Sequence, residues 1–306
     1  MRRGIEKIAC DFFQSTEPLT RVAVVPILSR RMVPTLREFI ERHPRLFVLT
    51  GAGCSTDSGI PDYRDADGGW KRAQPVMFQA FMSDLHTRRR YWARSLIGWR
   101  HFRRAQPNDA HHALARLEAQ GRVELLVTQN VDRLHQAAGS ESVVDLHGRL
   151  DQVRCMICRL TLPREELQDE LIRRNPAWTD FHAREAPDGD ADLERADFSA
   201  FDIPPCPYCG GIVKPDVVFF GESVPRDRVD AAMNGVQQAD AVLVVGSSLM
   251  VYSGYRFAQA AAEAGKPIAA VNLGRTRADD LLTLKVTEPC AAALAFLHEE
   301  AAAKTA

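Results

Sequence analysis

The sequence predicts an α/β protein built on a doubly wound parallel sheet, a Rossmann-like fold, that carries a small inserted module. Short segments rich in valine, leucine and isoleucine alternate with amphipathic helical segments along most of the chain. Most of these apolar segments lack polar alternation, as strands do when helices cover both faces of a sheet. The alternation breaks between about 149 and 213, where two Cys-x-x-Cys pairs stand.

Each element follows from this pattern in chain order. Strands are predicted at 46–50, 125–128, 143–146, 217–220, 241–245 and 268–271, and helices at 34–43, 109–120, 227–238 and 254–265. We therefore expect 29–148 and 214–306 to form the sheet domain and 149–213 to form the small module. Residues 1–28 show no sustained period and are expected to be an N-terminal extension of uncertain order.

Composition sets the class of protein. A chain of 306 residues allows about two domains, and 45% hydrophobic with 26% charged residues excludes a wholly disordered chain. The net charge of −1 excludes a globally basic nucleic-acid binder, and no apolar run approaches the roughly 18 residues of a membrane span. Seven cysteines without a secretory signal indicate a reducing, cytoplasmic location. We expect neither nucleic acid nor membrane as a partner.

A glycine-rich turn follows the first predicted strand. Gly51, Ala52 and Gly53 would let the backbone approach a phosphate, with the following N–H groups directed at the anion. The next glycine, Gly59, comes six positions after Gly53 rather than the three of the dehydrogenase fingerprint. A hydride-transferring dehydrogenase is therefore disfavoured, although a dinucleotide is not. The alternative is a tight turn without a ligand.

The loop after this turn contains Asp62, Tyr63 and Arg64. Such a loop is able to close over a ligand, with Arg64 supplying a fixed positive charge near a phosphate. A solvated surface loop is an equally good interpretation of the segment by itself.

Polar side chains also follow the next two strands. Gln129, Asn130 and Asp132 come at the carboxyl end of the second strand, where doubly wound folds bind ligands. Capping of the following helix is the alternative role for Asn130 or Asp132. His147 follows the strand at 143–146, and histidine is the commonest general base. A lone histidine is more often structural, but its position beside the other polar strand ends favours catalysis.

Three later segments repeat the pattern of a strand followed by small or polar residues. Each by itself is typical of an ordinary turn, but together they suggest one extended ligand. Their residues are Val217, Val218, Phe219, Phe220, Gly221 and Glu222; Gly246, Ser247 and Ser248; and Asn272 with Gly274.

The two cysteine pairs predict a metal site. Cys155 with Cys158 and Cys206 with Cys209 supply four thiolates, which complete a closed tetrahedral zinc site. The 47 residues between the pairs exceed the usual spacing, so the chain must leave the metal site after the first pair and return to it with the second. Redox-active dithiols are the alternative. A closed site is structural, so the metal should not perform the reaction.

Together these motifs resemble the sirtuins, NAD-dependent protein-lysine deacylases, in the order of that family over about 46–290. The resemblance is closer to the class II branch through the segments 91–94, 187–190, 214–221 and 251–256. Two positions depart from the family: Cys54 replaces the more usual isoleucine or alanine, and Asp65 replaces a frequent serine.

The resemblance implies roles for the residues. His147 would be the general base, with Asn130 and Asp132 ordering the nicotinamide ribose and carboxamide. Ser55 and Arg64 would hold the pyrophosphate. The remaining expected NAD contacts are Gly51, Ala52, Gly53, Asp62, Tyr63, Gln129, Gly246, Ser247, Ser248, Asn272, Gly274 and Cys290.

The resemblance also implies an acyl-lysine protein or peptide as substrate, lying as an added strand between 217–222 and 248–252. Tyr91 and Arg94, three apart in an expected helix, resemble a pair that grips the carboxylate of acidic acyl groups. The leading hypothesis is a deacylase that releases nicotinamide and O-acyl-ADP-ribose and carries one structural zinc. The alternatives are a mono-ADP-ribosyltransferase or lipoamidase using the same pocket, or a zinc-stabilised module that only senses NAD.

Overall fold

The computed structural model describes residues 34–71, 75–179 and 196–298. The extension predicted at 1–28 and the segment 187–190 lie outside the described residues. The described residues belong to one unit, which begins at Pro34.

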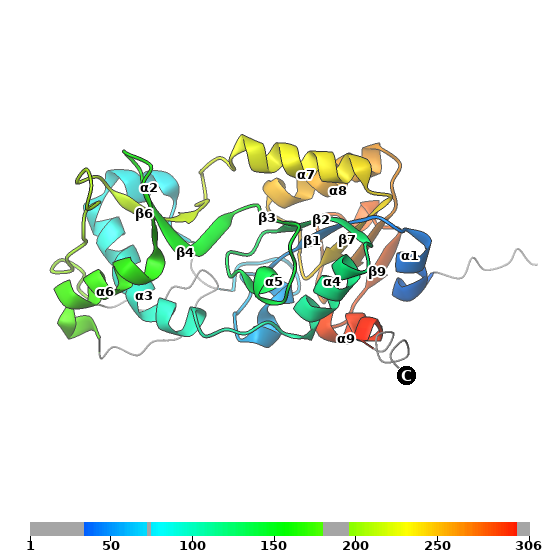
Figure 1. The fold of residues 1–306 in the computed structure, drawn as a ribbon, viewed down its shortest axis with the longest axis horizontal. Helices are drawn as coiled ribbons and strands as arrows, with labels where there is room; N and C mark the ends of the chain where they lie inside the picture. The colour runs from blue at the N-terminus through cyan, green and yellow to red at the C-terminus, as the bar shows by residue number, and fades with distance from the viewer. Residues whose placement is uncertain (1–33, 72–74, 180–195, 299–306) are drawn as a thin grey trace, which may run out of the picture. The chain divides into compact units, whose positions relative to one another are not determined.

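A six-stranded parallel sheet forms the larger half of this unit (Figure 1). Its order is β3–β2–β1–β7–β8–β9, and all neighbouring strands are parallel. The strands are β1 (Leu46–Thr50), β2 (Val123–Thr128), β3 (Val143–Asp145), β7 (Ala241–Val245), β8 (Ile268–Val271) and β9 (Leu284–Val286). The chain runs outward from β1 in one direction and from β7 in the other. The switch point of the sheet, where such folds bind ligands, therefore lies between β1 and β7.

Helices cover both faces of this sheet. Side chains alternate along β1: Leu46 and Val48 join the core under α1, α4 and α9, while Phe47 and Leu49 join the core under α7 and α8. Figure 1 shows α7 and α8 on one side and α4 and α9 on the other. The helices are α1 (Leu36–Arg42), α4 (Asp109–Ala119), α5 (Leu134–Ala137), α7 (Arg226–Gln238), α8 (Tyr252–Glu263) and α9 (Cys290–Leu294). The predicted doubly wound fold is confirmed.

A three-stranded antiparallel sheet forms the smaller half, in the order β5–β4–β6. Its elements are β4 (Gly148–Cys155), β5 (Thr161–Pro163), β6 (Val213–Val217) and α6 (Arg164–Arg174), with α2 (Phe78–Ser83) and α3 (Leu85–Phe102) packed on them. Trp92 and Leu96 of α3 share a core with Val153 and Leu171. The module boundaries 149–213 remain a prediction, and we propose that α2 and α3 belong to the same module because they share this core.

The prediction of a sheet strand at 217–220 was wrong. Val217 ends β6 in the smaller sheet, and the sixth place in the parallel sheet belongs to β9. The segment is apolar for another reason: Phe219 packs edge-on against Phe81 and also contacts the ring of Tyr91. The other five predicted strands, and the four predicted helices, are confirmed within a few residues at their ends.

Four short 3₁₀ turns complete the described structure: η1 (Ala52–Cys54), η2 (Thr56–Ser58), η3 (Pro176–Trp178) and η4 (Asp279–Leu281). Across the described ranges, every helix is too short or too polar to span a membrane.

Candidate active site

The switch point of the parallel sheet brings two glycine-rich strand ends into direct contact. Gly51 N–H donates to the Val245 carbonyl (3.1 Å), and Gly53 N–H donates to the Gly246 carbonyl (2.8 Å). A Cβ on Gly246 would lie 2.2 Å from the backbone nitrogen of Cys54, and the φ of Gly246 is +64°. Only glycine allows this approach. The backbones of the two strand ends therefore pack directly against each other and form a wall at the carboxyl ends of β1 and β7.

This wall is one side of a cavity of about 920 Å³. The cavity is lined by all the predicted catalytic, cofactor and substrate residues except Arg94: Gly51, Ala52, Gly53, Ser55, Asp62, Tyr63, Arg64, Tyr91, Gln129, Asn130, Asp132, His147, Val217, Val218, Phe219, Phe220, Gly221, Glu222, Gly246, Ser247, Ser248, Asn272, Gly274 and Cys290. The volume and the glycine backbone fit a dinucleotide, which is larger than most small metabolites.

Ser55 is the centre of a polar network in the cavity wall. Its hydroxyl donates to Asp132 Oδ2 (2.7 Å) and accepts from Asn130 Nδ2 (2.9 Å). Asn130 Nδ2 also donates to the Gly51 carbonyl (3.1 Å), and the Leu134 backbone N–H donates to Asp132 Oδ1 (3.0 Å). Burial raises the pKa of Asp132, and the hydrogen bonds from Leu134 and Ser55 oppose that rise. The network fixes the side chains of two predicted site residues relative to the glycine turn.

His147 is held by both ring nitrogens. Nδ1 lies 3.0 Å from the Gln129 carbonyl, so this nitrogen carries the proton, and Nε2 accepts from the Ser253 hydroxyl (2.7 Å). Burial lowers the pKa of His147 to about 4, and the charges of Arg228 and Arg256 act in the same direction. The ring is therefore neutral at pH 7, with a lone pair on Nε2. This is the state that a general base requires.

The segment after β6 lies against His147. Val218 N–H donates to the His147 carbonyl (2.7 Å), and Glu222 Oε2 accepts from Phe219 N–H (2.9 Å) and from Lys214 Nζ (3.0 Å). Lys214 is almost fully buried, and burial lowers its pKa while the Glu222 carboxylate opposes that change. The buried ion pair fixes the turn of 217–222 beside the predicted base.

The loop of 60–71 carries the only predicted cationic residue of the phosphate site. The Arg64 guanidinium lies 4.0 Å from the centre of the Trp70 ring, and its Nη1 donates to the Gly68 carbonyl (2.7 Å). Asp62 forms an ion pair with Lys71. These contacts fix the conformation of the loop, whose Asp62, Arg64 and Trp70 line the cavity.

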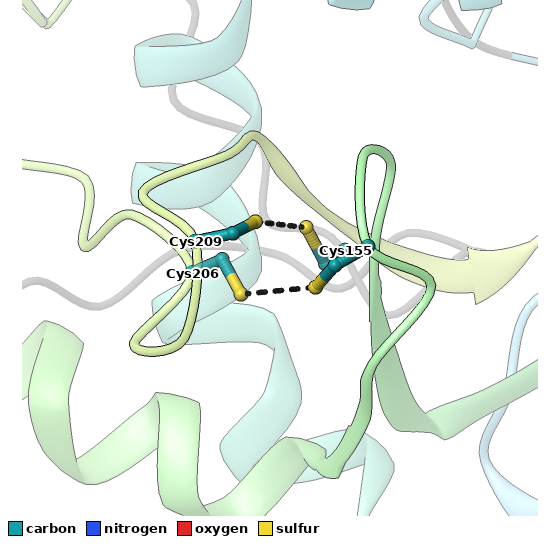
Figure 2. A group of neighbouring side chains, drawn as sticks. Cys155, Cys206 and Cys209 are labelled. Carbon is teal, nitrogen blue, oxygen red and sulfur yellow. Dashed lines mark hydrogen bonds between the residues drawn. The ribbon is translucent and has the colours of Figure 1, made fainter.

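The four cysteines come together in the smaller half (Figure 2). Their sulfurs lie within 4.8 Å of one another, with Cys155 and Cys209 3.4 Å apart and Cys158 and Cys206 3.7 Å apart. Four sulfurs around zinc at about 2.3 Å are about 3.8 Å apart, so this donor set fits a closed tetrahedral zinc site.

Known proteins of similar sequence and fold identify the family of this chain. The model of the Sir2 family matches residues 51–253. The chain belongs to the Sir2 family. Among curated sirtuins, it is 70% identical over 266 residues to a protein of Xanthomonas campestris named "NAD-dependent protein deacetylase", covering 87% of this chain and 91% of that protein. It is 72% identical over 263 residues to "NAD-dependent protein deacetylase 2" of Bradyrhizobium diazoefficiens, covering 86% and 96%.

Solved sirtuin structures share the fold. A structure titled "Sir2-p53 peptide-NAD+" aligns with a TM-score of 0.68 at 31% identity, covering 87% of this chain and 97% of that one. Another, "Sir2 bound to acetylated peptide", has a TM-score of 0.68 at 30% identity, covering 88% and 99%. The assignment to class II remains a prediction.

Sequence reasoning did not assign several residues that line the sirtuin cavity, and two of them, Ser253 and Trp70, contact predicted site residues. Ser253 lies in the first turn of α8, and its hydroxyl is 2.7 Å from His147, although 106 positions separate them. The signal available in the sequence was that Ser253 is a polar residue at the start of a helix, shortly after the turn that ends a strand. Trp70 stacks on Arg64, and an aromatic residue beside a loop arginine was the corresponding signal.

Proposed function

We propose that this sirtuin is an NAD-dependent protein-lysine deacylase that removes acetyl groups from lysine side chains. The curated relatives bear the name NAD-dependent protein deacetylase, and related solved structures contain NAD or an acetylated peptide according to their titles. One observation carries the proposal: a neutral histidine, His147, lines a cavity of dinucleotide size beside the Ser55–Asn130–Asp132 network.

The proposed cofactor contacts follow from the cavity wall. Backbone N–H groups of the glycine turn and the Arg64 guanidinium would hold the pyrophosphate, since both favour a phosphate anion. Asn130 and Asp132 would orient the nicotinamide ribose, with Ser55 fixing both side chains. Ser247 and Asn272 would contact the adenosine end. NAD, when bound, supplies the ribose carbon that receives the acyl oxygen.

His147 would accept a proton at Nε2 from a ribose hydroxyl. In the described structure Nε2 accepts a hydrogen bond from Ser253, so a substrate hydroxyl would replace the Ser253 hydroxyl as the donor. The Gln129 carbonyl keeps the proton on Nδ1 and thus keeps the lone pair on Nε2. The acyl-lysine peptide would lie beside 217–222 as an added strand, with 248–252 on its other side.

We further propose that zinc bound to the four cysteines is structural. Four thiolates leave no open coordination position for substrate or water, so the metal would stabilise the smaller half of the protein and take no part in the reaction.

The test measures nicotinamide release and deacetylation of an acetyl-lysine peptide with NAD, in wild type and in His147→Ala. The variant should lose activity by about 100- to 10,000-fold, because that is the usual contribution of a general base. Its melting temperature and NAD binding should stay close to wild type. Near-normal turnover by this variant would refute the mechanism. Labelled ADP-ribose appearing on the protein substrate, without loss of the acyl group, would favour an ADP-ribosyltransferase instead.

A further inference from the structure

A second cluster of metal-ligating side chains lies behind the cavity wall, separate from the four cysteines. Cys54, His111 and His135 each offer one ligand atom, and these atoms lie within 4.8 Å of one another. Their exposed fractions are 1%, 0% and 1%. They come from η1, α4 and α5, so three separate elements bring them together. Cys54 lies between Gly53 and Ser55, both of which line the cavity.

One nitrogen in this cluster lacks a partner. His135 Nε2 lies 2.9 Å from Thr50 Oγ1, while Nδ1 is buried and has no hydrogen-bond partner among the described residues. A buried polar atom left unpaired typically costs about 1–3 kcal/mol, so native proteins seldom retain one without a reason. Among the described residues, the His111 ring makes two long hydrogen-bond contacts, at 3.3 Å from Asn108 N and at 3.4 Å from Ser55 Oγ. The His111 ring is therefore held only by long hydrogen bonds, and the His135 ring keeps one nitrogen without a partner among the described residues.

The ionisation states of the two histidines also suit a metal, whereas the thiol must lose its proton to bind one. Burial lowers the pKa of His111 to about 4 and lowers that of His135 well below its ordinary value, so both imidazoles are neutral, the form that binds metals. Burial raises the pKa of the Cys54 thiol. Metal binding would release one proton from this thiol, so affinity should rise with pH.

One thiolate and two neutral imidazoles are the ligand types that Zn²⁺ prefers, and three protein ligands leave one position for water. Zinc would draw the three ligand atoms to about 3.3–3.6 Å from one another. We propose that Cys54, His111 and His135 form a second zinc site, and that its occupation inhibits this sirtuin.

The inhibitory part rests on the proposed function and follows from Ser55. This residue is next to Cys54 in the chain and accepts a hydrogen bond at 3.4 Å from the His111 ring. Its hydroxyl also holds Asn130 and Asp132. When zinc draws Cys54 and His111 together, Ser55 must move with them. That movement disturbs the network that orients NAD and lowers the affinity for NAD.

The binding test adds Co²⁺ to protein that already carries its four-cysteine zinc. Wild type should take up one Co²⁺ per chain, with thiolate-to-cobalt charge-transfer absorption and tetrahedral d–d bands. Cys54→Ser and Cys54→Ala should both lose this absorption. Cys290→Ser is the matched control, because Cys290 is another buried thiol near Cys54 that lies outside the cluster, and it should keep the signal. Absence of cobalt uptake by wild type, or retention of the signal in Cys54→Ser, would overturn the site.

The inhibition test measures deacetylation during a Zn²⁺ titration. Cys54→Ala should be as active as wild type without added zinc, and should require about tenfold more zinc or greater for half inhibition, since loss of a ligand weakens metal binding strongly. Saturating NAD should slow cobalt uptake by wild type. Cobalt bound without any inhibition would overturn the inhibitory role alone. A cobalt signal in a protein without deacetylase activity would refute the proposed function and leave the site intact.

Discussion

The acid limb of the pH–rate profile reports the protonation state of His147. Burial lowers the pKa of this histidine to about 4, and Arg228 and Arg256 add to that effect. Because the proposed base must be neutral, kcat/KM should stay high until the pH falls through about 4. A histidine with an ordinary pKa of about 6.5 would lose activity two and a half units earlier.

The difference is large at pH 5.5. With a pKa of about 4, about 97% of His147 is neutral at that pH, whereas an ordinary histidine would be about 9% neutral. The value of kcat/KM at pH 5.5 relative to pH 8 should therefore be near 1, and not near 0.1. The assay is nicotinamide release at low concentrations of NAD and acetyl-lysine peptide. A wild-type midpoint near 6.5 would refute the reasoning.

Two variants on α7 sharpen this experiment. Arg228→Gln removes one of the charges that lower the pKa of His147, so the acid limb should move to higher pH. Arg226→Gln on the same helix is the matched control, because Arg226 is highly exposed and does not affect that pKa. An equal shift in both variants would mean that the general charge of the helix, and not Arg228, sets the limb.

Folding must be followed at the same pH values. The folded pKa of His111 is about 4, below the unfolded value of about 6.5, so the unfolded state binds a proton first as the pH falls. The contribution of His111 to the free energy of unfolding should therefore be constant above about pH 6.5 and fall between pH 6.5 and 4, by up to about 3 kcal/mol. Urea unfolding at pH 7 and pH 5 measures this loss. Equal stability at the two values would contradict it.

Three further predictions concern zinc, the glycine turn and acyl selectivity. Cys155→Ser should lose its zinc, and with it the folded structure of the smaller half and the activity. A metal-free variant with full activity and an unchanged melting temperature would contradict a structural role. Gly53→Ala brings a Cβ within 3.0 Å of Gly246 Cα, so it should lower the free energy of unfolding by about 1–3 kcal/mol and weaken NAD binding in calorimetry. Gly59→Ala is the control, because its Cβ would have no atom within 4 Å. It should lower the free energy of unfolding by only about 1–2 kcal/mol, owing to its left-handed backbone, and leave NAD binding unchanged. Arg94 does not line the cavity, whereas Tyr91 does, so Arg94→Met should leave the ratio of glutaryl-type to acetyl removal unchanged; a selective loss of glutaryl-type removal would show that Arg94 reaches the acyl group.

The sequence predicts the parallel sheet well because burial on both faces removes polar alternation from its strands. All five residues of β1 are buried, as are all five of β7, and 46–49 and 241–245 are uninterrupted apolar runs. Since parallel strands end at one edge, the polar residues after them could also be grouped into one site.

The smaller half could not be predicted in the same way. β4 mixes buried apolar residues with arginine and aspartate, and its pairing with β6 is interrupted by a register shift after Gly148. α3 buries almost every residue from Tyr91 to Trp99 while carrying many arginines, which hides its apolar face. The contact of Ser253 with His147 joins residues 106 positions apart, and no local pattern reports such a contact.

The position of His147 explains why zinc at the distant four-cysteine site should matter for the reaction. The residue lies in a two-residue link between β3 of the parallel sheet and β4 of the smaller sheet. Gln129, which follows β2 of the parallel sheet, accepts a hydrogen bond from the His147 ring. Val218, which follows β6 of the smaller sheet, donates one to the His147 carbonyl. β4 runs from Gly148 beside this histidine to Cys155 at the metal cluster, eight residues and roughly 20–25 Å in extended form. Zinc at that distance cannot touch the substrate. It would act by fixing the far end of β4, whose near end positions the base. Loss of zinc should therefore loosen the position of His147 relative to Gln129, Ser253 and Val218.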